Sequence, residues 1–285
     1  MPKTSTLSLS ASCPLRTADD VLSAMQTLEN PEQRKVLMTF FKTGVGQYGE
    51  GDRFLGLKVP ETRAIVKVAR DLPLFEIQIL LNSPWHEARL CGFLILVSQF
   101  EQTEKVSKKK SAMTQPSTQQ DLMAQRDAIV DFYLLNATKA NNWDLVDLSC
   151  YHILGRWLQL PSRYSLQDKI AIFDRLAASP NLWERRISMV ATLGALMVGE
   201  TAYTLKYAAY HIHSFRQHPD LSHDLMHKAV GWMLREMGKR CSMDDLRQFL
   251  AEYASIMPRT ALRYAIEKMS PEEKTYWMTT PQNSE

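Results

Sequence analysis

The sequence predicts an all-α protein in which HEAT-like antiparallel helix pairs stack into a curved solenoid with a concave face. Apolar residues recur at three- and four-residue spacing along almost the whole chain, and convincing period-two strands are absent. Only 11 glycines interrupt this pattern, so the breaks between helices are short. One helix pair cannot bury its own apolar face, and successive pairs are therefore expected to stack. Because no clean sequence repeat is present, a compact helical bundle stays an alternative.

The first elements have clear start signals. Asn30 and Pro31 open one helix, with Asn30 as its N-cap, and Val36, Leu37, Phe40 and Phe41 are expected to form its buried stripe. Ser83-Pro84 opens another helix, which runs through WHEARLCGFLILVSQF. Further helices are expected to start near Asp121, Trp143, Ser165, Asn181, Thr201, Leu221, Met243 and Pro258.

The composition is that of a globular protein. The 285 residues are 45% hydrophobic and 23% charged, which is enough for a substantial core. The formal net charge is +3, which permits a nucleic-acid binder only if the Lys and Arg side chains gather on one surface.

The cysteine spacing and the N-terminal residues indicate a protein of a reducing compartment. The four cysteines are far apart and form no CxxC pair, which favours a cytoplasmic protein without a disulfide framework. No apolar run reaches the roughly 18 residues needed to span a bilayer, so no membrane partner is expected. Residues 1–16 are expected to form a flexible tail without a secretion signal, and residues 17–278 a single domain.

One internal segment, residues 101–120, is polar and carries Lys108, Lys109 and Lys110. This composition predicts a long surface loop inside the domain. The lysines are expected to be solvated, or to form an auxiliary basic arm.

Two motifs suggest ligands but lack the required context. Gly44, Gly46 and Gly49 spell GxGxxG, yet no strand precedes them, so a dinucleotide site is not expected. His223 and His227 are spaced i,i+4, but no acidic or cysteine ligand accompanies them at convincing spacing. We therefore expect neither a metal nor a cofactor.

The stretch WDLVDLSCYHILGRWL, from Trp143 to Leu158, breaks its own amphipathic pattern. At about 100° per residue, Asp147 lies in the middle of an apolar face that Trp143 shares. A carboxylate there needs a cation or a hydrogen-bond donor. Asp147 is thus either a buried structural residue, bonded to a backbone amide or an Arg, or a functional carboxylate beside Trp143.

A second helix, DLMHKAVGWMLREMGKR, has a core row and a cationic row. Its core row is Met226, Val230, Met233 and Met237. Lys228, Trp232, Arg235 and Lys239 repeat the same spacing on roughly the opposite side. An indole among cations suits a nucleic-acid backbone, although burial of Trp232 by the next helix pair explains the pattern as well.

Arg186, in NLWERRISMV, is a cation in an otherwise apolar row that contains Leu182, Met189 and Leu193. We expect it to pair with Asp147 or with a phosphate, or to form an ordinary interhelical salt bridge.

Five pieces of the sequence resemble the AlkD-like DNA alkylation-repair glycosylases, which are HEAT-like repeat proteins. The matching pieces, in chain order, are FLGLKVPETR from Phe54, HEARLCGFLIL from His86, NNWDLVD from Asn141, LWERRISMV from Leu182 and KAVGWMLREMGK from Lys228. They are spread in order over about residues 20–270, which is most of the chain. The segment 101–120 is longer than the usual connection in that family.

The resemblance implies roles for individual residues. It places the catalytic carboxylate on Asp147, one cleft tryptophan on Trp143, the second on Trp232 and the cleft arginine on Arg186. It also implies a monomer that holds double-stranded DNA along its concave face and removes cationic N3- or N7-alkylated purines without a base pocket.

Four cations are expected to contact DNA phosphates: Lys58, Lys228, Arg235 and Lys239. Two other functions stay open at this point. One is a non-catalytic binder of distorted DNA on the same fold, and the other is a HEAT-type protein–protein scaffold.

Overall fold

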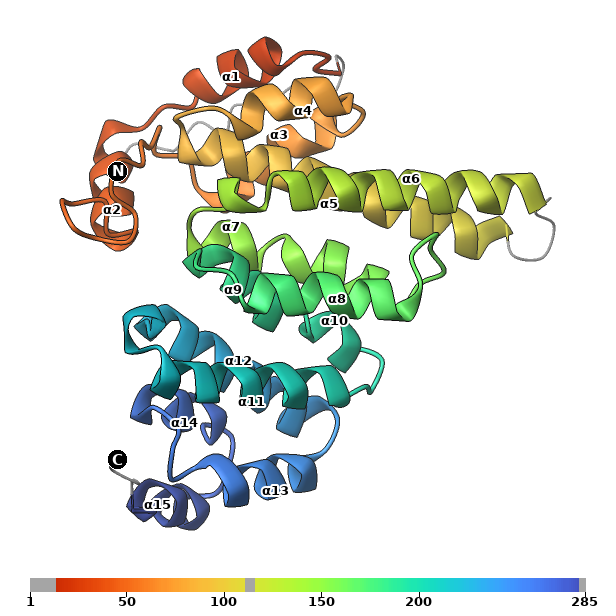
Figure 1. The fold of residues 1–285 in the computed structure, drawn as a ribbon. Helices are drawn as coiled ribbons and strands as arrows, with labels where there is room; N and C mark the ends of the chain where they lie inside the picture. Colours follow the sequence, from red (N-terminus) through yellow and green to blue (C-terminus); the bar gives the residue numbers. More distant parts are fainter. Residues whose placement is uncertain (1–13, 111–115, 282–285) are drawn as a thin grey trace. The chain divides into compact units, whose positions relative to one another are not determined.

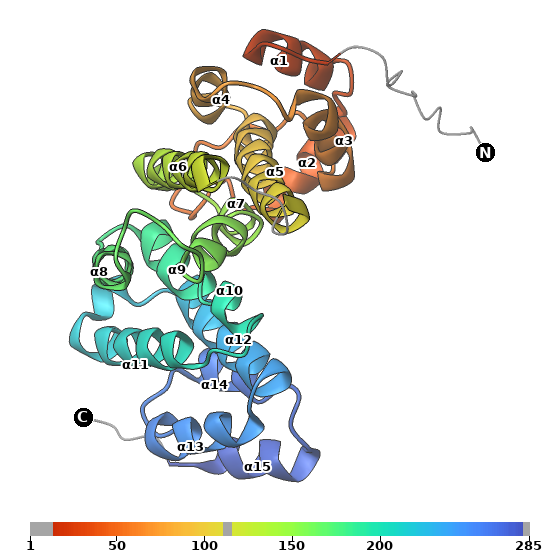
Figure 2. The ribbon, with the colours of Figure 1, turned by 90° about the vertical axis from the view of Figure 1, so that its right-hand side faces the viewer.

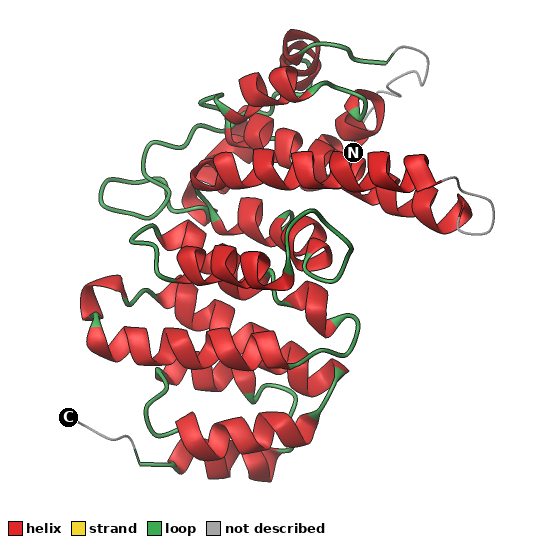
Figure 3. Cartoon of the chain, turned by 45° about the vertical axis from the view of Figure 1, so that its right-hand side comes forward, coloured by secondary structure: helices red, strands yellow, loops and turns green. Residues whose placement is uncertain are grey.

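The computed structural model describes residues 14–110 and 116–281 and is helical throughout (Figure 1). Within this part of the chain there is no strand, and the only β pairing is one isolated parallel bridge between Arg53 and Trp85 (Figure 3). The all-α prediction is confirmed. The chain divides into two compact units, Met1–Gln102 and Thr103–Glu285, which are described separately. The concave solenoid and the single domain over residues 17–278 stay predictions.

The first unit contains four complete helices and the start of a fifth. They are α1 (Ala18–Gln26), α2 (Pro31–Phe40), α3 (Val59–Ala69), α4 (Leu74–Leu81) and α5 (His86–Lys110). Thr17 and Asn30 cap α1 and α2, each side-chain oxygen accepting a backbone N–H of the first turn. Helix α1 packs against α3 and α4, with Val21 and Met25 fully buried.

The expected buried stripe of α2 is confirmed only at Phe41, because no residue within the helix itself is buried. Phe41, which follows the helix, is buried and stacks on Phe54, but Val36 and Phe40 have exposed fractions of 59% and 58%. Apolar spacing predicts which residues share a face, but only tertiary packing decides whether that face is covered.

The second unit holds the rest of the helices. They are α6 (Pro116–Leu135), η1 (Ala137–Lys139), α7 (Trp143–Asp147), η2 (Tyr151–Gly155), α8 (Leu166–Ala177), α9 (Leu182–Val190), α10 (Leu193–Leu196), α11 (Ala202–Gln217), η3 (Pro219–Leu221), α12 (Asp224–Arg240), α13 (Met243–Tyr253), α14 (Arg259–Ala265) and α15 (Pro271–Thr279).

Helices α9 and α12 form the centre of the second unit. Helix α9 packs against α7, α8, α11 and α12, and α12 packs in turn against α13 and α14. Figure 2 shows α8 with α9, then α11 with α12, then α13 with α15 as successive layers of this unit. The predicted core row of α12, Met226, Val230, Met233 and Met237, is fully buried.

The predicted loop at residues 101–120 is largely helical. Helix α5 extends to Lys110, so Lys108, Lys109 and Lys110 belong to its last turn, and α6 begins at Pro116. Polar composition does not prevent a helix when most residues have good helix propensity, as Glu, Gln and Lys do. Residues 111–115, and residues 1–13 of the expected tail, lie outside the described part of the chain.

The cysteines carry no disulfide within the described residues. Cys91, Cys150 and Cys241 are free thiols, and Cys13 lies outside the described part. Burial alone raises the pKa of Cys91 far above that of an ordinary thiol, so this thiol stays protonated.

Candidate functional site

Asp147 and Arg186 form a bidentate ion pair in the second unit. Asp147 is the last residue of α7, and Arg186 lies on α9, which packs against α7. The guanidinium donates from Nε to Oδ1 at 2.9 Å and from Nη2 to Oδ2 at 2.7 Å. Such a fork fixes the orientation of the carboxylate as well as its charge. The predicted pairing of Arg186 with Asp147 is confirmed.

Arg186 also joins this pair to a third helix. Its remaining terminal nitrogen, Nη1, donates to the backbone carbonyl of Leu225 in the first turn of α12. The three guanidinium contacts therefore connect α7, α9 and α12. The Nη1 contact was not predicted, because a carbonyl acceptor leaves no signal in a sequence pattern.

Opposing effects act on the charge of Asp147. Burial raises the pKa of its carboxyl group above the ordinary value, the Arg186 guanidinium acts in the opposite direction, and Asp144 adds to the rise. Arg186 is buried, with 6% of its side chain exposed, whereas Asp147 keeps 13% exposed. The carboxylate is thus paired, largely desolvated and still accessible.

The two tryptophans lie on the helices that this pair connects. Trp143 precedes Asp147 by four residues in α7, which places both on one side of that helix. Trp232 follows Leu225 by seven residues, about two turns or 10 Å further along α12 and on the same side. Both indoles are partly exposed.

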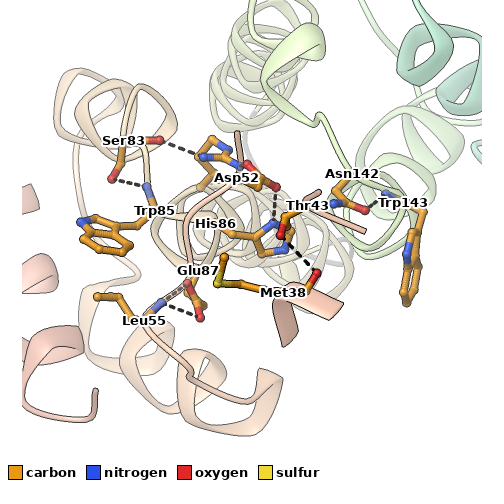
Figure 4. A network of polar contacts seen from close by, with 11 residues as sticks. Met38, Thr43, Asp52, Leu55, Ser83, Trp85, His86, Glu87, Asn142 and Trp143 are labelled. Carbon is orange, nitrogen blue, oxygen red and sulfur yellow. Dashed lines mark hydrogen bonds and ion pairs between the residues drawn. The ribbon is translucent and has the colours of Figure 1, made fainter. Parts of the chain in front are cut away.

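The start of α7 is fixed by a buried asparagine. Asn142 has no exposed surface, and its side-chain oxygen accepts the backbone N–H of Trp143 at 2.9 Å (Figure 4). This contact holds Trp143 at the first position of the helix, where the chain turns from an extended conformation.

The expected regular helix from Trp143 to Leu158 is interrupted. Helix α7 ends at Asp147, and a π-helical turn, η2, follows at Tyr151–Gly155. A Cβ atom on Gly155 would lie 2.2 Å from the carbonyl oxygen of Ala191, so η2 and the start of α10 meet backbone to backbone. This tertiary contact accompanies the change from α-helix to π-helix, and the apolar spacing of the sequence does not predict it. π-Turns of this kind are frequent at functional sites.

The four predicted phosphate-binding cations differ in their surroundings. Lys58, in the first unit, and Lys239 are exposed. Lys228 pairs with Asp224 at 2.7 Å and keeps 38% of its side chain exposed. Arg235 is 19% exposed and holds both Glu236 and Glu267, so part of its charge is already neutralised.

The loop before Lys58 is held by a network that sequence reasoning missed. The buried carboxylate of Glu87 accepts the backbone N–H groups of Leu55, Gly56 and Leu57 at 2.8–3.2 Å (Figure 4). The backbone of Gly56 has a φ of 95°, and a Cβ there would lie 2.1 Å from the carbonyl oxygen of Asn30. Gly56 in FLGLKVPETR and Glu87 in HEARLCGFLIL were the two residues of the sequence that could have indicated this network.

Beside Glu87, His86 and Arg89 meet one buried aspartate. His86 Nδ1 lies 3.0 Å from the Asp52 carboxylate, and Arg89 donates to the other oxygen of the same group. Burial works against ionisation of Asp52, but the contacts with His86 and Arg89 prevail and lower its pKa below the ordinary value. All three side chains are buried, which indicates a structural network.

Other ligand motifs receive no support from the described residues. Gly44, Gly46 and Gly49 lie in turns after α2 rather than between a strand and a helix. No group of three or more His, Cys, Asp or Glu side chains in the described part could hold a metal ion. Likewise, none of its helices is long and apolar enough to cross a membrane.

Comparison with known proteins identifies the family. The family model described as "DNA alkylation repair enzyme" matches residues 21–269. Comparison with curated proteins finds no match. A solved structure described as a predicted DNA alkylation repair enzyme from Enterococcus faecalis is similar, with 18% identity and a TM-score of 0.59 over 85% of this chain and 97% of that chain. That likeness bears on the fold alone. The family match covers most of the sequence, and this chain therefore belongs to the family of DNA alkylation repair enzymes.

Proposed function

We propose that this chain is a DNA glycosylase that hydrolyses the N-glycosidic bond of cationic N3- or N7-alkylated purines in duplex DNA. The observation that carries the proposal is the paired, largely desolvated and still accessible Asp147 carboxylate. Two partly exposed indoles lie on α7 and α12, the two helices that Arg186 of α9 contacts. A group of this kind suits the stabilisation of a transient positive charge.

The alkylated base explains why one carboxylate is sufficient. Alkylation at N3 or N7 gives the purine a positive charge, so it leaves without being protonated, whereas ordinary glycosidases need a second carboxyl group as an acid. The electron pair of the C1′–N bond departs with the purine, which becomes neutral. Water then adds to C1′ and releases one proton to the solvent.

Each site residue has a separate role in this mechanism. As the bond breaks, positive charge moves onto the sugar, and Asp147 stabilises it and orients the water. Trp143 and Trp232 hold the deoxyribose and attract the cation, by about 0.5–2 kcal/mol each. Arg186 keeps the carboxylate ionised and aimed.

DNA binding in this proposal is electrostatic. Lys58, Lys228, Arg235 and Lys239 contact phosphates of a duplex bound by a monomer, and no base-binding pocket is needed. Selectivity then comes from the weakness of the bond itself. A neutral lesion such as uracil is therefore left in place.

The test is release of methylated purines from duplex DNA containing N7-methylguanine, under single-turnover conditions. Asp147→Asn is expected to lower the rate by about 10²–10³. The matched control is Asp131→Asn, which removes an aspartate paired with Arg163 elsewhere in the second unit and should leave the rate unchanged. Equal rates for wild type and Asp147→Asn, or release of uracil, would contradict the mechanism. Duplex binding without release would favour a non-catalytic DNA binder.

A further inference from the structure

Two successive arginines of α9 hold the backbone on both sides of His223. Arg185 donates from Nη2 to the carbonyl of Leu221 at 3.0 Å, and Arg186 donates from Nη1 to the carbonyl of Leu225. Both arginines are buried. The segment that leads into α12 is therefore tied directly to the helix that carries the Asp147 partner.

His223 is the N-cap of α12 and holds the same residue that Arg186 holds. Its Nδ1 accepts the backbone N–H of Leu225 at 3.1 Å, while the carbonyl of Leu225 accepts from Arg186. Both backbone polar groups of Leu225 are thus bound by side chains. Nδ1 accepts a hydrogen bond only when it carries no proton, so this contact requires neutral imidazole with its proton on Nε2.

We propose that His223 is a positioning residue: its neutral imidazole fixes the first turn of α12 so that the Leu225 carbonyl holds Arg186 in line with Asp147. This inference rests on the proposed function, in which the Asp147–Arg186 pair forms the reacting site. The chain of contacts runs from His223 through Leu225 and Arg186 to Asp147, and every step is a hydrogen bond.

The charges around His223 favour the neutral form. Burial lowers the pKa of its imidazole below the ordinary value of 6.5, and Asp224 acts in the opposite direction. Three cations oppose protonation further, Arg185 and Arg186 from α9 and Lys228 from α12. His227, one turn further along α12, lies near His223 and also has a pKa below the ordinary value, chiefly through burial.

Protonation of His223 converts Nδ1 into a donor that faces the N–H of Leu225. The cap is then lost, the first turn of α12 loosens, and Arg186 loses its third contact. Because the pKa of His223 is lowered, this change occurs on the acid side of the ordinary histidine range and leaves the neutral range unaffected. The site therefore acquires an acid limb in addition to that of Asp147.

The test follows purine release and an Arg186 resonance in the same protein from about pH 8 down to about pH 4, beyond the acid end of the ordinary histidine range. The Arg186 Nε–H signal, assigned by its disappearance in Arg186→Lys, is expected to shift in step with the imidazole signal of His223. Asn at the cap accepts the same N–H but does not titrate. His223→Asn should keep the rate near neutral pH and lose this step, while His223→Ala lowers the rate roughly fivefold.

The matched control is His213→Asn, which removes an exposed imidazole from α11 of the same unit and should leave both curves unchanged. The positioning role is overturned if the Arg186 signal does not shift as His223 titrates. It is also overturned if His223→Asn has the same acid limb of purine release as wild type. If the Arg186 signal responds but no purine is ever released, the positioning role stands and the glycosylase proposal fails. The two failures are therefore distinguishable.

Discussion

The side chain of Asp147 is 13% exposed, whereas that of Arg186 is 6% exposed. Arg186 donates a hydrogen bond to each carboxylate oxygen of Asp147. All three guanidinium nitrogens of Arg186 have acceptors in the protein. Each carboxylate oxygen still has a free lone-pair position after accepting one N–H. These contacts use three of the five guanidinium N–H groups. The carboxylate of Asp147 is the more exposed partner and keeps acceptor positions, as a site that meets a cationic sugar requires.

Removing Arg186 should affect both stability and the pH profile. Arg186→Ala leaves the buried Asp147 carboxylate without its cation, which should lower the free energy of unfolding by roughly 3 kcal/mol. The guanidinium opposes the rise in the pKa of Asp147, so its loss raises that pKa further and moves the acid limb of purine release to higher pH. Urea unfolding and the pH–rate profile measure the two effects.

Two variants control for this prediction. Arg163→Ala breaks an exposed ion pair with Asp131 and should change the unfolding midpoint little. Arg186→Lys keeps a positive charge but cannot form the fork to Asp147 and also reach Leu225. Its unfolding midpoint should lie between those of wild type and Arg186→Ala. Similar losses in Arg186→Ala and Arg163→Ala would show that the Asp147 pair contributes no more than a surface pair.

Local signals predicted the helix starts and the central ion pair. Ser165 and Asn181 cap α8 and α9 as their side-chain chemistry predicts. Asp147 and Arg186 each stood out as a charge in an apolar row, and two buried opposite charges on neighbouring helices must be satisfied somewhere. The pairing was therefore one of the alternatives that the sequence offered for Arg186, beside a phosphate and another interhelical salt bridge.

Features set by tertiary contact were not predictable. The π-turn after α7 accompanies the close approach of Gly155 to Ala191, and the exposed face of α2 depends on what packs against Val36 and Phe40. The cap at His223 was missed because histidine is not among the preferred N-cap residues. Its i,i+4 spacing to His227 was considered only as a metal site, which was not expected.

Salt dependence should separate free cations from paired ones. Lys239 is exposed, so Lys239→Gln should lower the slope of log K against log salt by about 0.9 for a duplex. Arg235→Gln should lower it by less, because the guanidinium already holds Glu236 and Glu267. Fluorescence anisotropy of a labelled duplex at several salt concentrations measures both slopes. Equal reductions would mean that Arg235 leaves its carboxylates to bind a phosphate.

The pH dependence of stability should reveal the buried His211. Its Nε2 bonds to Ser188 Oγ at 2.9 Å, its Nδ1 has no hydrogen-bond partner among the described residues, and burial, with a smaller effect of Arg185, lowers its pKa from 6.5 to about 3. Below pH 6.5, His211 therefore binds a proton in the unfolded chain but stays unprotonated in the folded chain. The free energy of unfolding should fall by about 1.4 kcal/mol per pH unit from this group as the pH drops.

Urea unfolding at several pH values measures this slope. His211→Gln should make the slope shallower, and His213→Gln, on the exposed side of α11, should not. Identical slopes in all three proteins would mean that His211 is protonated in the folded state.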